Sequence, residues 1–157
     1  MSVPLIFRNH FQHAYVVRNL EKAMVPFRER CGVGEWQVMP LPEGSPVRAI
    51  GLAYVQNVMI ELIEAVPGHE TIYRRFIPES ESAARFHHLG YLIEREEDYR
   101  AAVAQLEAAG WPAAYAGRAG EILDFHYADT FAQLGHYCEL VHLRAAGKGF
   151  FAQVPHN

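Results

Sequence analysis

The sequence has few of the features that would place it outside ordinary globular proteins. Its two cysteines, Cys31 and Cys138, are too few for a disulfide scaffold, so we expect buried thiols in a reducing cytoplasm. Lys and Arg number 14 against 18 Asp and Glu, which gives a net charge of −4 and no basic field to bind nucleic acid or an anionic membrane. No apolar run approaches the roughly 18 residues of a membrane span, and the N-terminal segment MSVPLIFRNH lacks the long apolar core of a signal peptide.

Low-complexity tracts and flexible linkers are also missing, so we expect a compact chain throughout. The length of 157 residues fits one domain. Histidine, by contrast, is abundant: the sequence contains nine, an enrichment that can indicate metal binding or acid–base chemistry.

A strand–helix–strand–strand–strand pattern occurs twice along the chain. The first copy has its helix at 20–30 and its strands at 11–17, 36–39, 49–56 and 58–65, with a tight turn at 56–57. The second has its helix at 96–109 and its strands at 87–93, 111–116, 122–127 and 136–143. We therefore expect a single domain made of two modules, 10–65 and 87–144, with a connector at 66–86 and a C-terminal tail at 145–157. The connector is expected to contain one helical turn near 73–76.

The two copies also match in their residues. QHAYVV at 12–17 resembles HHLGYL at 87–92, an offset of 75, and MIELIEAV at 59–66 resembles YCELVHLR at 137–144, an offset of 78. These matches fall in equivalent elements of the two halves, as expected for an internal repeat.

Each matched segment carries one titratable side chain within an apolar strand, and these four are His13, Glu61, His88 and Glu139. A carboxylate in an apolar strand is rarely buried unless it is paired or binds a metal. Two imidazoles and two carboxylates form a mixed nitrogen and oxygen site, which suits Zn²⁺, Fe²⁺, Mn²⁺, Co²⁺ or Ni²⁺ and leaves positions for a chelating substrate. His87 competes with His88, but the repeat pairs His88 with His13 and His87 with Gln12, so we choose His88.

Each of these residues has a structural alternative when it is taken alone. A single histidine at the start of a strand is commonly a hydrogen-bonded structural residue, and a single glutamate in a strand usually lies on the solvent face. Glu64, which is out of phase with Glu61, fits the second description.

Further polar side chains are candidates for a substrate pocket. An arginine in the connector can hold a carboxylate or phosphate of the substrate, although a solvated connector is the simpler interpretation. The candidate substrate-binding residues are Tyr54, Tyr73, Arg74, Tyr127 and His136.

The segments FQHAYVV, VMIELIEAV, FHHLGYLI and GHYCELV, in this order and spacing, resemble the vicinal oxygen chelate superfamily. That superfamily includes glyoxalase I, methylmalonyl-CoA epimerase, extradiol dioxygenases and bleomycin-resistance proteins. The resemblance covers about residues 10–144 and is strongest to the glyoxalase I and methylmalonyl-CoA epimerase branch. It implies an α+β fold in which two βαβββ modules form a curved mixed sheet around a metal site. It also implies one divalent ion (Zn, Fe, Mn, Co, Ni or Mg) held by His13, Glu61, His88 and Glu139.

The expected function is metal-dependent proton transfer next to a carbonyl, as in an isomerase, an epimerase or a lyase. The substrate would be a small chelating molecule, either a 2-oxo compound or an acyl thioester, with Glu61 and Glu139 as the catalytic residues that take and return the proton. Two alternatives remain open: a metal-free small-molecule-binding protein of the bleomycin-resistance type, and an Fe(II) dioxygenase. We expect a cytoplasmic homodimer, with no nucleic-acid or membrane partner.

Overall fold

The computed structural model describes residues 6–157, and the chain divides into two compact units. The first unit holds residues 12–87 and 153–157, and the second holds the described residues 6–11 together with 88–152. The boundaries fall within two strands, β1 (His10–Val17) and β5 (Ala84–Leu92). Within residues 6–157, no helix combines the length and apolarity needed to cross a membrane.

The first unit is built on a four-stranded array in the order β2-β3-β4-β1. β1 and β4 run parallel, whereas the β2–β3 and β3–β4 pairs are antiparallel. The β3–β4 hairpin turns at residues 56–57, as the sequence predicts, and Gln56 there has a φ of 53°. The remaining elements of this unit are α1 (Leu20–Cys31), β2 (Gln37–Pro40), β3 (Val47–Val55), β4 (Val58–Ala65) and the 3₁₀ turn η2 (Arg74–Phe76).

The second unit repeats this arrangement in the order β5-β8-β7-β6, with β5 and β8 parallel. Its elements are η1 (Ile6–Asn9), α2 (Glu96–Ala108), β6 (Ala113–Ala119), β7 (Leu123–Ala128), α3 (Phe131–Leu134), β8 (Tyr137–Leu143) and α4 (Gly147–Ala152). Three of these, the short helical elements η1, α3 and α4, are not predicted from the sequence. The chain thus has an α+β fold with two βαβββ modules, and this prediction is confirmed.

Local signals set the ends of α1. The Asn19 side chain accepts a hydrogen bond from Lys22 N at 3.0 Å, and Gly32 ends the helix with a φ of 74°. Glu64 of β4 also accepts from the backbone nitrogen of Leu20 at 2.9 Å and pairs with Arg48 at 2.9 Å. Glu64 is therefore a half-buried anchor for the helix, and the expectation that it lies free on the solvent face is wrong.

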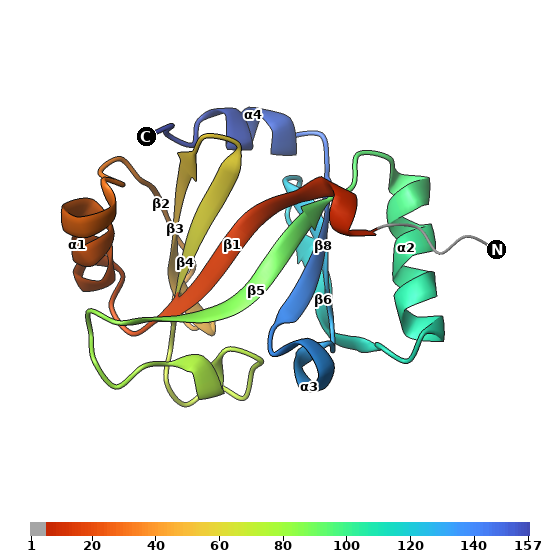
Figure 1. The fold of residues 1–157 in the computed structure, drawn as a ribbon, viewed down its shortest axis with the longest axis horizontal. Coiled ribbons are helices and arrows are strands. Elements are labelled where there is room, and N and C mark those ends of the chain that lie inside the picture. Colours follow the sequence, from red (N-terminus) through yellow and green to blue (C-terminus); the bar gives the residue numbers. More distant parts are fainter. Residues whose placement is uncertain (1–5) are drawn as a thin grey trace. The chain divides into compact units, whose positions relative to one another are not determined.

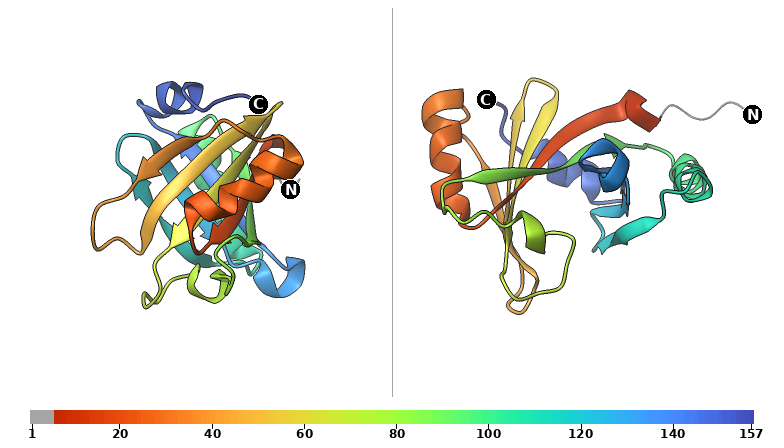
Figure 2. Two further views of the ribbon diagram at one scale, coloured as in Figure 1. Left: turned by 90° about the vertical axis from the view of Figure 1, so that its left-hand side faces the viewer. Right: turned by 60° about the horizontal axis from the view of Figure 1, so that its bottom comes forward.

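Each long helix covers one face of the strands in its own unit. Val17 of β1 and Leu62 of β4 are buried in the same cluster as Leu20 and Met24 of α1, with Ile60 packed beside them. Figures 1 and 2 show α1 lying across β3 and β4. Gly51 lies directly under the helix, because a Cβ there would lie 2.5 Å from the terminal methyl group of Met24.

In the second unit, α2 packs on Tyr91, Ala128, Cys138 and Leu140. Cys138 is fully buried in that cluster, but Cys31 is exposed at the end of α1, so the expectation of two buried thiols is wrong for Cys31. The residues on the opposite face of each array, away from α1 or α2, form the candidate functional site.

Candidate functional site

A buried histidine–glutamate pair lies on the second unit's strands. His88 Nε2 is 3.1 Å from Glu139 Oε2, and the two residues are 0% and 7% exposed. The parallel β5–β8 register produces this contact, because it pairs Gly90 with Glu139 and His88 with Tyr137. Leu89, Tyr91, Cys138 and Leu140 have the opposite phase and pack against α2. His88 and Glu139 therefore share the face that α2 does not cover.

The ring of Tyr127 packs edge-on against His88, with centroids 4.9 Å apart and planes at 84°. Tyr127 is paired with Glu139 in the β7–β8 register and is buried. An ionised carboxylate in such surroundings is costly unless it is paired or binds a cation.

The first unit presents Glu61 and Gln12 on its corresponding face. The parallel β1–β4 register pairs Ala14 with Glu61 and Gln12 with Met59. Gln12 is 4% exposed, and its Nε2 donates to Met59 Sδ at 3.4 Å. Glu61 is half-buried. Their neighbours of opposite phase, Ile60 and Leu62, pack against α1.

His13 does not share the face of Glu61. It pairs with Ile60 and has the phase of Tyr15 and Val17, which pack on the α1 side. The prediction that His13 and Glu61 point to one site is therefore wrong. Matching His13 with His88 shifts the alignment of the two repeats by one residue. Because successive strand residues point to opposite faces, this shift places the wrong side chain on the site face.

The hydrogen-bonded register gives a different equivalence between the modules. Ala14 opposite Glu61 corresponds to Gly90 opposite Glu139, and these glycine and alanine positions are 76 residues apart. The same offset of 76 makes Gln12, not His13, the counterpart of His88. Sequence reasoning missed Gln12 because it matched histidine with histidine.

The five predicted substrate-binding residues have different surroundings. Tyr54 of β3 pairs with Met59, so it has the phase of Glu61, and partial burial raises the pKa of its phenol. Tyr127 lies beside His88, as described above. Tyr73 is buried against the ring of His87, with centroids 5.0 Å apart. The strand registers thus place Tyr54 on the site face of the first unit and Tyr127 on that of the second.

The other two candidates, Arg74 and His136, lie outside the strands, in η2 and in the turn before β8. Arg74 is exposed on η2 and forms an ion pair with Glu70, which supports the interpretation of a solvated connector. The Nδ1 atom of His136 lies 3.1 Å from the carbonyl oxygen of Leu134, in the turn before β8.

His87, the competitor of His88, is fully buried by the connector. Its Nε2 lies 3.2 Å from the carbonyl oxygen of Ile72, and its ring contacts Phe76 with centroids 4.7 Å apart. These contacts are those of a structural histidine.

The C-terminal residues supply a side chain that the sequence analysis left unassigned. His156 stacks on Tyr54, with centroids 4.6 Å apart and an interplanar angle of 9°. Asn157 fixes this segment, because its side chain accepts from Glu35 N at 2.8 Å and donates to Glu35 O at 3.0 Å. No sequence signal indicates this return of the chain to β3.

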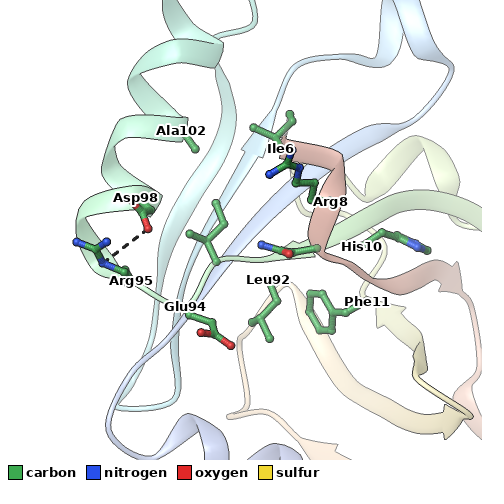
Figure 3. Close-up of a pocket in the computed structure, with 11 residues that line it drawn as sticks. Ile6, Arg8, His10, Phe11, Leu92, Glu94, Arg95, Asp98 and Ala102 are labelled. Atoms are coloured by element: carbon green, nitrogen blue, oxygen red, sulfur yellow. Dashed lines mark ion pairs between the residues drawn. The ribbon is translucent and has the colours of Figure 1, made fainter. Parts of the chain in front are cut away.

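A cavity of about 700 Å³ lies in the second unit between η1 and the start of α2 (Figure 3). Its apolar lining includes Ile6, Phe11 and Leu92. Two charged residues also line it, and Arg95 Nε lies 3.8 Å from Asp98 Oδ2. None of the predicted site residues is among the described residues that line it. We therefore assign it no part in the candidate site.

Comparisons with known proteins agree with this geometry. Residues 11–128 match the model of the Glyoxalase/Bleomycin resistance protein/Dioxygenase superfamily, which is more than half of the chain. The chain belongs to this superfamily. The prediction of a vicinal oxygen chelate protein is thus confirmed. A comparison with curated protein sequences finds no match.

Several solved structures share the fold of this superfamily member. Methylmalonyl-CoA epimerase from Mycobacterium tuberculosis is 14% identical with a TM-score of 0.69, and the match covers 95% of this chain and 96% of that one. A methylmalonyl-CoA epimerase in complex with methylmalonyl-CoA and NH4+ is 14% identical with a TM-score of 0.65, covering 87% and 95%. A variant of the Streptomyces coelicolor methylmalonyl-CoA epimerase in complex with 2-nitronate-propionyl-CoA is also 14% identical with a TM-score of 0.65. The match covers 87% of this chain and 98% of that one. Identities this low establish the fold alone.

Proposed function

We propose that Gln12, Glu61, His88 and Glu139 bind one divalent metal ion. The observation that carries this proposal is the buried His88–Glu139 pair, whose register is repeated by Gln12 and Glu61 in the other module. The donor set fits such an ion: one imidazole nitrogen, one amide oxygen and two carboxylates suit Zn²⁺, Fe²⁺, Mn²⁺, Co²⁺, Ni²⁺ or Mg²⁺. The hydrogen bond from Gln12 Nε2 to Met59 also orients the amide so that its oxygen can serve as the ligand.

The proposed activity is proton transfer at a carbon next to a carbonyl. A bound divalent ion supplies Lewis-acid polarisation of that carbonyl and stabilises the negative charge of the enolate. The substrate is a 2-oxo compound or an acyl thioester with two neighbouring oxygen atoms. The acyl-CoA ligands of the structurally similar epimerases support the thioester option.

The two carboxylates differ in ways that suit different steps. Glu139 is buried and lies 3.1 Å from His88, whereas Glu61 is half-buried. We assign the removal of the proton to Glu61, because a more accessible carboxylate reorients at lower cost. Glu139 then returns the proton in an epimerase or isomerase.

Incorporation of deuterium from solvent tests this function directly. The metal-loaded protein is incubated in D₂O with a panel of 2-oxo acids and acyl-CoA thioesters, and exchange at the α-carbon is followed by NMR. We expect exchange into at least one member, and Glu61→Gln to remove most of it while retaining much of the metal binding. An amide cannot accept the proton but keeps an oxygen ligand.

Glu64→Gln is the matched control, because Glu64 lies on the same strand with the opposite phase and contacts α1. It should leave the exchange rate unchanged at temperatures where the protein is folded. Full activity in Glu61→Gln would refute the assignment of the base. Oxygen consumption with an aromatic diol would favour the Fe(II) dioxygenase, and ligand binding without bound metal would favour the bleomycin-resistance type of protein.

We also propose that the protein is a cytoplasmic homodimer. Apart from the second subunit, its only partner is the small-molecule substrate. The exposed free thiol of Cys31 supports a reducing compartment. Light scattering of the purified protein measures the oligomeric state.

A further inference from the structure

Three aromatic side chains form a cluster of mutually contacting rings on β6 and β7, next to His88. Tyr127 contacts His88, and Phe125 contacts Tyr127 with centroids 5.9 Å apart. Tyr115 of the edge strand β6 completes the cluster, with its centroid 5.2 Å from that of Phe125 and 6.2 Å from that of Tyr127. We call Tyr115, Phe125 and Tyr127 the aromatic stripe.

The aromatic stripe lies on the same face as the His88–Glu139 pair. Tyr127 is paired with Glu139 across β7 and β8, and Tyr115 is paired with Tyr127 across β6 and β7. Cross-strand partners point to the same side of a sheet. The opposite side is occupied by α2, which packs on Ala128, Cys138 and Leu140. The stripe therefore extends the site face and does not belong to the core beneath α2.

The three rings of the stripe differ in exposure. Tyr127 is 4% exposed, Phe125 is half-buried and Tyr115 is 45% exposed. Gly117 makes room for the Phe125 ring, because a Cβ there would lie 3.0 Å from it. The residues on either side of Tyr115 in β6 are Ala114 and Ala116. Nearly half of the Tyr115 side chain is thus open to solvent, with small residues beside it.

We propose that the substrate of the candidate site carries an aromatic ring close to its chelating oxygen atoms, and that the aromatic stripe binds this ring. The proposal rests on the proposed function and names its substrate class. An aromatic ring gains edge-to-face or offset contacts with the exposed ring of Tyr115 that a saturated ring of equal size does not. The cluster lies close to the site, because Tyr127 contacts both His88 and Tyr115.

Matched probes test the proposal on the full-length protein. Pyruvate, phenylpyruvate and cyclohexylpyruvate share one 2-oxo acid head and differ in the attached group. Their dissociation constants are measured by calorimetry with the Co²⁺-loaded protein. We expect phenylpyruvate to bind several-fold more tightly than cyclohexylpyruvate. Tyr115→Ala should weaken phenylpyruvate by roughly three- to tenfold and leave pyruvate unchanged.

Two further variants make the result specific. Tyr115→Leu keeps an apolar side chain but removes the ring, so it should abolish the preference for the phenyl group over the cyclohexyl group. Phe7→Ala removes another exposed aromatic ring of the same unit, 50% exposed on η1, and should change nothing. Equal affinities for the phenyl and cyclohexyl probes, or an unchanged affinity in Tyr115→Ala, would overturn the proposal.

Failure of the proposed function is recognised separately. Metal content is measured first, and the titrations are repeated with metal-free protein. Absence of bound metal contradicts the metal-dependent function, while the phenyl preference, which depends on the stripe alone, still decides the ring proposal. If no probe binds under either condition, the ring proposal is wrong.

Discussion

His126 is a buried histidine outside the candidate site. It is 3% exposed on β7, and within residues 6–157 its Nε2 atom has no hydrogen-bond partner. It has the phase of Ala128 and Leu140, which pack against α2. Burial lowers the pKa of this imidazole below its ordinary value of 6.5, although the charge of Glu107 opposes the shift. The folded protein therefore disfavours the imidazolium form.

We predict a loss of stability in mild acid that depends on His126. Below pH 6.5 the unfolded chain takes up a proton at this residue before the folded chain does, so the unfolded state binds more protons. The free energy of unfolding then decreases as the pH falls from 7 through 6.5 towards the lower folded pKa. Urea denaturation between pH 7.5 and 5.5 measures this slope.

His126→Leu should reduce the slope, whereas His69→Leu, in the connector, should keep it. An identical slope in wild type and His126→Leu would show that other groups cause the acid sensitivity.

Individual residues also show where the sequence was informative and where it was not. His88 and Glu139 lie together as the repeat suggested, because both segments keep the parallel strand register. Gln12, and not His13, has the strand position equivalent to that of His88. The similarity of two short segments does not specify the strand register to within one residue. The contacts of Glu64 with Leu20 and Arg48 depend on tertiary packing that the strand pattern does not contain.

Among the elements, the long strands and helices were predictable, and the short helices were not. The 3.6-residue and two-residue periodicities located α1, α2 and most strands within a few residues. Helices α3 and α4 are four and six residues long, too short to show a periodic pattern. The return of residues 153–157 to β3 depends on the hydrogen bonds of Asn157 and Tyr54, which no local signal encodes.

Helix α4 gives a prediction at this scale. Its first residue, Gly147, is buried, and a Cβ there would lie 2.3 Å from the carbonyl oxygen of Ile122 and 2.9 Å from Leu143 Cβ. The Ile122 carbonyl already accepts a hydrogen bond from Arg144 N at 2.8 Å, so it cannot move freely. Gly147→Ala should therefore lower the free energy of unfolding by about 2 kcal/mol, as overpacked sites do. Thermal and urea denaturation measure the effect.

Gly149→Ala is the matched control in the same helix, because nothing lies within 4 Å of its added Cβ. It should be neutral or slightly stabilising, since alanine favours helix over glycine. Equal effects of the two substitutions would contradict the close packing of α4.

The whole molecule is best understood as two modules that repeat one register. In each module a parallel pair of strands places a glutamate opposite a small residue, Ala14 in one and Gly90 in the other. Two positions before that small residue stands a polar side chain, Gln12 or His88. The superfamily match and the shared fold of the solved structures agree with the two-module architecture. We propose that these four polar residues bind one metal ion.

Titration of metal-free protein with Co²⁺ measures this binding in the wild type and in the adjacent variants Gln12→Leu and His13→Leu. Adjacent strand residues point to opposite faces, so the two variants change one face each. We expect one ion per chain for the wild type, an affinity reduced at least about tenfold in Gln12→Leu, and a change within about twofold in His13→Leu. A wild type that binds no ion, or an affinity lost in His13→Leu and kept in Gln12→Leu, would contradict metal binding by Gln12, Glu61, His88 and Glu139.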